Sequence, residues 1–170
     1  MNNKTRQTII GVVIFFAVLC LIFIFGNSLK DSAASSEQST AVKEFLLNIA
    51  RLFGFDGDIN TSTLRSFAHV VEFCMLGSCL GVLAIYFSRR KTCAGLLRPL
   101  SFLAAAVGVG VFFAVIDELL QLASVGRACD IADVMLDTMG IVSGVLLGTL
   151  AYFLFIKLIN CRKNREKDKI

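Results

Sequence analysis

The stretch LSFLAAAVGVGVFFAVIDELLQLAS, residues 100–124, decides the fold class of this chain. Its first seventeen residues carry no charge; Asp117 and Glu118 then follow side by side, with Gln121 one turn later. A helix needs about 20 mostly apolar residues to cross a bilayer. The stretch therefore predicts a membrane-spanning helix with two adjacent carboxylates near one end.

Three further stretches have the same apolar character. The predicted spans are about residues 9–29, 67–87, 100–123 and 138–159, followed by a basic tail over 160–170. Hydrophobic residues make up 56% of the 170 residues, which is more than a soluble domain usually contains. These features predict an all-α integral membrane protein, a four-transmembrane-helix bundle forming a single domain over residues 1–170.

Lysine and arginine are unequally divided between the two ends of this bundle. Twelve fall in the N-terminal segment, the loop after the second span and the tail, whereas five fall in the other two connections. Because cytoplasmic segments are enriched in these residues, both termini are predicted to be cytoplasmic. The net charge of +4 reflects this topology and does not suggest nucleic acid as a partner.

The connection between the first two spans contains two kinds of sequence. Its first part, KDSAASSEQST over residues 30–40, is polar and Ser-rich and predicts a loop. The second part, AVKEFLLNIARLFG over residues 41–54, places apolar residues at helical spacing. It predicts an extracytoplasmic amphipathic helix that lies in the membrane interface or caps the bundle.

Small residues recur at spacings of four on two of the spans. Gly140, Gly144 and Gly148 lie on the fourth span, and Gly77 and Gly81 lie on the second. Such rows allow neighbouring backbones to approach closely. We interpret them as packing surfaces.

Polar residues from three segments are expected at a similar depth near the outer surface. Arg65, His69 and Glu72 share one helical face, because they are four and three residues apart. Asp133 and Asp137 continue the face of the three glycines on the fourth span. Ionisable groups inside a membrane usually face a partner or a water-filled cavity. The predicted polar site contains Arg65, His69, Glu72, Asp117, Glu118, Gln121, Arg127, Asp133 and Asp137.

Acidic groups outnumber basic groups in this region. Its carboxylates are Glu72, Asp117, Glu118, Asp130, Asp133 and Asp137, against two arginines and a histidine. Some carboxylates must therefore be protonated, solvated or bound to a cation, since unpaired buried charge is costly. Magnesium or calcium is conceivable, but zinc would require more His or Cys ligands. The expectation from sequence is no metal and no cofactor.

The chain resembles the VanZ-like membrane proteins of bacteria. The resemblance is carried by FGNSLKDSAASS (25–36), RSFAHVVEFCMLG (65–77) and DELLQLASVGRACDIADVMLDTMGIVSGVLLG (117–148). The motif residues are Arg65, His69, Glu72, Phe73, Gly77, Asp117, Glu118, Gln121, Gly126, Arg127, Asp133, Asp137, Gly140 and Gly144. Three positions depart from the family pattern: Phe73 stands where Tyr is common, Val125 where Pro is usual, and Asp137 where many relatives have Asn.

This resemblance implies a multi-pass protein of the bacterial plasma membrane. It also implies a possible role in resistance to teicoplanin, a lipoglycopeptide, which the name-giving family member confers. Membrane lipids, a cell-wall lipid intermediate or the lipoglycopeptide itself are the partners to expect.

Four functional hypotheses remain open at this stage. The first is a binding module in which Arg65 and Arg127 contact a headgroup phosphate or carboxylate. The second is an intramembrane enzyme acting on a lipid or sugar-phosphate headgroup, with catalytic candidates His69, Glu72, Asp117 and Glu118. Ion transport and a purely structural polar cluster are the third and fourth. The binding module is preferred.

Overall fold

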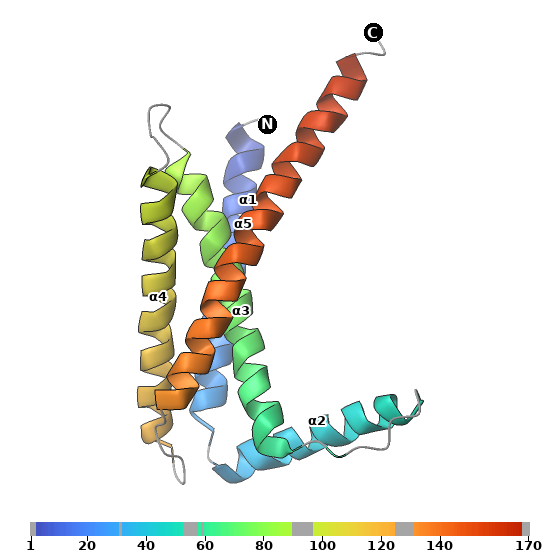
Figure 1. The fold of residues 1–170 in the computed structure, drawn as a ribbon, viewed down its shortest axis with the longest axis vertical. Helices are drawn as coiled ribbons and strands as arrows, with labels where there is room; N and C mark the ends of the chain where they lie inside the picture. Colours follow the sequence, from blue (N-terminus) through green and yellow to red (C-terminus); the bar gives the residue numbers. More distant parts are fainter. Residues whose placement is uncertain are drawn as a thin grey trace.

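A computed structural model gives the arrangement of five helices (Figure 1). It describes residues 3–30, 32–52, 58, 60–89, 97–124 and 131–167. The helices are α1 (Asn3–Ser28), α2 (Ser32–Leu52), α3 (Thr61–Ser88), α4 (Leu97–Leu122) and α5 (Ile131–Lys167). No strand occurs among these residues.

Four of the helices are long and apolar enough to cross a membrane. The candidate spans are Arg6–Ser28, Thr61–Ser88, Leu97–Leu122 and Ile131–Arg162. The prediction of an all-helical chain with four such spans is therefore confirmed. Helices α3 and α5 extend beyond the predicted bounds at both ends, whereas α1 and α4 begin earlier than predicted and end one residue sooner. The basic tail continues α5 to Lys167, because no Gly or Pro interrupts the chain after Gly148.

The prediction of a loop over residues 30–40 is wrong. The structure places the start of α2 at Ser32, and the helix continues without interruption to Leu52. The segment lacks Gly and Pro, and its alanines, Glu37 and Gln38 have good helix propensity. The serines therefore do not break the helix.

Helix α2 crosses one end of the bundle, below the start of α3 in Figure 1. It packs against α3, and its Leu47 is buried. Val42 and Phe45, from the predicted apolar stripe, stay exposed. The predicted helix is therefore present over residues 41–52, and these two side chains of its apolar stripe are exposed.

Helices α3 and α5 form the most extensive helix pair in the structure. A Cβ atom added to Gly77 would lie 2.5 Å from the carbonyl oxygen of Ile141, and one added to Gly81 would overlap the backbone of Val145. In return, the glycine row of α5 lies against the α3 backbone at Val70, Cys74 and Ser78. The two predicted glycine surfaces thus face each other, as expected for close helix packing.

The core is small and lies where α1, α3, α4 and α5 meet. Its buried residues include Phe73 and Leu76 of α3, Ile141 of α5, Ile24 of α1 and Ala114 of α4. The outer faces of the spans carry many exposed Phe, Leu, Ile and Val side chains. Exposed apolar surface of this extent suits a helix bundle surrounded by lipid.

Candidate functional site

Buried polar side chains collect at the end of the bundle that α2 crosses. This end contains the last turns of α1 and α4 and the first turns of α3 and α5 (Figure 1). The buried polar residues here are Ser28, Asp117, Glu118, Gln121 and Asp137. Among the described residues, the only other buried polar side chain is Ser88, at the far end of α3.

The carboxylate of Asp117 contacts side chains from three helices. Ser28 of α1 donates a hydrogen bond to its Oδ1 atom, and Gln121 of α4 donates from Nε2 to its Oδ2 atom over 3.1 Å. The Nδ1 atom of His69 on α3 lies 3.9 Å from the same Oδ2 atom. The carboxylate is thus held from α1 and from its own helix, with the imidazole of α3 beside it.

Two further hydrogen bonds extend this network. Arg65 of α3 donates to Oε1 of Gln121 over 3.5 Å, so Gln121 connects the guanidinium to Asp117. The hydroxyl of Ser124 donates to the carbonyl oxygen of Ser28 over 2.9 Å. The first bond links α3 to α4, and the second fixes the end of α1 against the end of α4.

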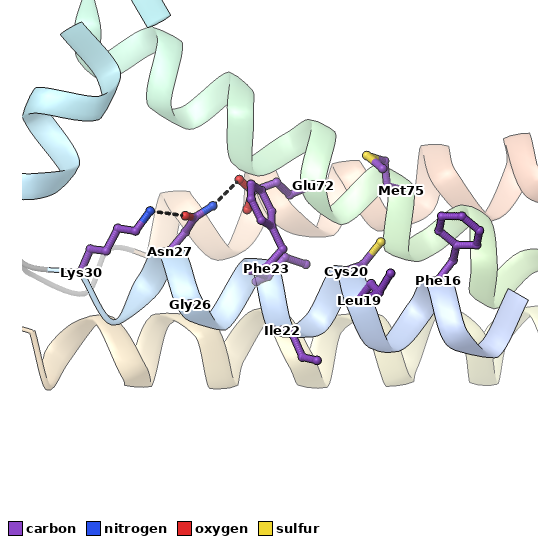
Figure 2. A pocket seen from close by; sticks show the side chains of 11 residues that line it. Phe16, Leu19, Cys20, Ile22, Phe23, Gly26, Asn27, Lys30, Glu72 and Met75 are labelled. Carbon is purple, nitrogen blue, oxygen red and sulfur yellow. Dashed lines mark hydrogen bonds between the residues drawn. The ribbon is translucent and has the colours of Figure 1, made fainter. Parts of the chain in front are cut away.

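A second polar chain runs along the side of α1 that faces α3. Asn27 donates from Nδ2 to Oε1 of Glu72 over 3.0 Å, and Lys30 donates to Oδ1 of Asn27 over 2.9 Å (Figure 2). The Asn27 amide therefore bridges a cation and a carboxylate from different helices. Asn27 of α1 therefore orients the carboxylate of Glu72, beside the hydrogen-bond network around Asp117.

Asp137 is the deepest acidic group of α5. Its side chain is 1% exposed, and neither of its carboxylate oxygens has a hydrogen-bond partner. Ligand atoms of His69, Asp117 and Asp137 all lie within 4.8 Å of one another. This trio, which we call the His–Asp–Asp group, is the set of described residues suited to hold a metal ion.

Two adjoining hollows reach part of this polar end, at Arg65, His69 and Glu72. The first, of about 710 Å³, runs along α1 and is lined mainly by apolar side chains, including Phe16, Cys20 and Phe23 (Figure 2). The second, of about 390 Å³, is lined by residues of α1, α2 and α3, among them Arg65 and His69. Both share the lining residues Phe23, Asn27, Lys30, Glu72 and Met75. An apolar groove therefore opens onto a polar end.

The structure brings most of the predicted polar residues together. Arg65, His69, Glu72, Asp117, Glu118, Gln121 and Asp137 gather at this end, and Asp133, half-buried, lies one turn from Asp137. Arg127 and Asp130 lie outside the described residues.

Sequence reasoning missed three contributors at the end of α1 and directly after it, namely Asn27, Ser28 and Lys30. All three lie in FGNSLKDSAASS, so that shared motif was the available signal.

The VanZ/LLP1 family profile matches residues 13–155, which is most of the chain. The chain belongs to the VanZ/LLP1 family. Among curated proteins and among solved structures, no significant match was found. The matched range includes two of the spans in full, most of the first and last spans, and every polar contact described above, so the polar end lies within the VanZ/LLP1 region.

Proposed function

We propose that this VanZ/LLP1 protein binds the headgroup of a membrane or cell-envelope lipid at its polar end. The observation that carries the proposal is the continuity of the two hollows. The apolar groove along α1 suits an acyl chain, and it opens at Asn27, Lys30 and Glu72 into the polar hollow. Lipid-binding sites combine such an apolar surface with a few convergent polar groups.

The charges of the polar hollow favour a headgroup with an anionic part. Arg65 and Lys30 both line it, and a guanidinium presents several donors that match phosphate oxygens. Glu72 lines the same hollow and would contact an amine or hydroxyl group of the ligand. A headgroup with a phosphate and a polar substituent therefore suits this hollow, because the phosphate would face the basic side chains and the substituent would face Glu72.

The distribution of basic residues supports an outward-facing site. The polar end is formed by the ends of α1 and α4 and the starts of α3 and α5. It lies opposite the Lys- and Arg-rich end. By the positive-inside tendency, the termini are cytoplasmic, the polar end faces the outer leaflet, and α2 lies on the extracytoplasmic side. In this orientation the protein would meet outer-leaflet phospholipids, cell-wall lipid intermediates and lipoglycopeptides of a bacterial plasma membrane.

Calorimetric titration of the purified full chain with short-chain phosphatidylglycerol tests this proposal. Short-chain phosphatidylcholine serves as the zwitterionic comparison, and Arg51→Ala, an exposed arginine of α2, as the matched control. We expect tighter binding of the anionic lipid, with weaker binding in Arg65→Ala and no change in Arg51→Ala. Equal affinity for both lipids, unaffected by Arg65→Ala, would contradict the proposal.

A second function is supported by the pairing of His69 with Asp117. An imidazole beside a carboxylate that other groups orient is an arrangement used for general acid–base catalysis, and His69 lines the polar hollow. An enzyme acting on a phosphate-containing headgroup is therefore the alternative. Lipid turnover by the wild type that disappears in His69→Ala would support it, whereas full turnover by that variant would exclude His69 as the base.

A further inference from the structure

The carboxylate of Asp137 lacks a partner although it is buried in an apolar bundle. Its side chain is 1% exposed, and both oxygens are without a hydrogen bond. A buried carboxylate in this situation is costly unless a cation or a proton compensates it. A second acidic residue, Asp117, contributes a ligand atom within 4.8 Å, which increases the need for compensation.

The third member of the group makes the local chemistry more specific. His69 supplies a ring nitrogen within the same 4.8 Å. Magnesium and calcium prefer oxygen ligands, whereas an imidazole with two carboxylates suits zinc or manganese. Three protein ligands leave open coordination positions for water or for an oxygen of a ligand.

We infer that His69, Asp117 and Asp137 form a binding site for a divalent transition-metal ion, Zn²⁺ or Mn²⁺. Ligands lie about 2.0–2.2 Å from such an ion, so neighbouring ligands are about 3.0–3.6 Å apart. The ligand atoms, now within 4.8 Å of one another, would need to move closer by about 1–2 Å to reach that distance. The sequence led us to expect no metal, because His and Cys are scarce. The burial of Asp137 without a hydrogen-bond partner, which the sequence did not show, changes that expectation.

The surroundings of Asp117 resemble the outer shell of a metal site. Ser28 and Gln121 each donate a hydrogen bond to one of its oxygens, which fixes the orientation of the carboxylate. A carboxylate oxygen has more than one lone pair, so both atoms can still coordinate. Outer-shell partners of this kind typically change metal affinity by about 10–100-fold. We therefore assign Ser28 as a positioning residue of the metal site.

Metal content of the purified full chain tests this inference. The protein is stripped with EDTA, dialysed against Zn²⁺, Mn²⁺ or Mg²⁺ alone, and analysed by inductively coupled plasma mass spectrometry. We expect about one Zn²⁺ or Mn²⁺ per chain and little Mg²⁺. Asp137→Asn is expected to weaken binding at least about tenfold. The matched control Asp58→Asn removes a surface carboxylate paired with Lys43 and should leave binding unchanged.

A measurement on the wild type avoids any dependence on the folding of variants. His69 is the only histidine of the chain, so nitrogen coupling in the pulsed EPR spectrum of bound Mn²⁺, recorded without a polyhistidine tag, identifies it as a ligand. The inference would be overturned if no metal bound stoichiometrically under any condition, or if bound Mn²⁺ showed no imidazole coupling. It would also be overturned if Asp137→Asn bound metal as well as the wild type, or if Asp58→Asn lost as much metal as Asp137→Asn. Preferential Mg²⁺ binding would overturn the choice of transition metals. These measurements use no lipid, so their failure is distinct from a failure of headgroup binding.

Discussion

Asp117 shows how a single residue connects the sequence to the site. Along the chain it is one of two adjacent carboxylates in an apolar run, but in the structure Ser28, Gln121 and His69 surround it. The contact with α3 could be expected, because spacing and depth place His69 at the same level. The contact with Ser28 was missed, because a serine where a helix ends is common and only its place in FGNSLKDSAASS marks it. Whether these residues bind a ligand stays a prediction.

The hydrogen bond from Ser28 to Asp117 gives a prediction at this scale. Ser28→Ala should destabilise the folded protein by about 1–2 kcal/mol, as observed for polar contacts between membrane helices. In the double variant with Asp117→Ala, the two losses should not add, because each change removes the Ser28–Asp117 hydrogen bond. Unfolding titrations of the four proteins in mixed micelles measure the coupling. Fully additive losses would show that the two side chains do not interact.

At the scale of helices, the four spans could be predicted well, but the connection between the first two spans could not. Length and apolarity determine a spanning helix, so four spans could be identified from composition alone. The glycine rows also indicated surfaces for close packing, although not which helices would pair. Helix α2 was harder, because Ser-rich sequence is compatible with both a loop and a helix, and the packing of α2 against α3 depends on tertiary contacts.

The close contact of α3 with α5 makes a second prediction. Gly144→Val introduces a side chain where the backbone of Cys74 and Ser78 leaves no space, so we expect destabilisation by about 1–3 kcal/mol or more. Gly108→Val is the matched control, because nothing lies within 4 Å of its added Cβ atom and the change in helix propensity is the same. Unfolding midpoints in detergent compare the two. An equal effect would mean that propensity, and not packing, determines the loss.

For the whole molecule, the orientation in the membrane gives a third prediction. In a chain whose only cysteine is Cys161, which is exposed near the end of α5, a membrane-impermeant thiol reagent should react only after permeabilisation. In a cysteine-free chain carrying Asp58→Cys, at the opposite end, the reagent should label intact cells. The reverse pattern would place the polar end in the cytoplasm.

The proposed role as a whole depends on the groove along α1 and the polar end acting as one site. Native mass spectrometry of the chain, released from the membrane in a mild detergent, tests this most directly. We predict that the wild type and Arg51→Ala retain a bound lipid. Arg65→Ala and Cys20→Phe, which change the polar end and the apolar groove respectively, should both lose it. Equal lipid retention by all four proteins would contradict a headgroup site joined to an acyl-chain groove.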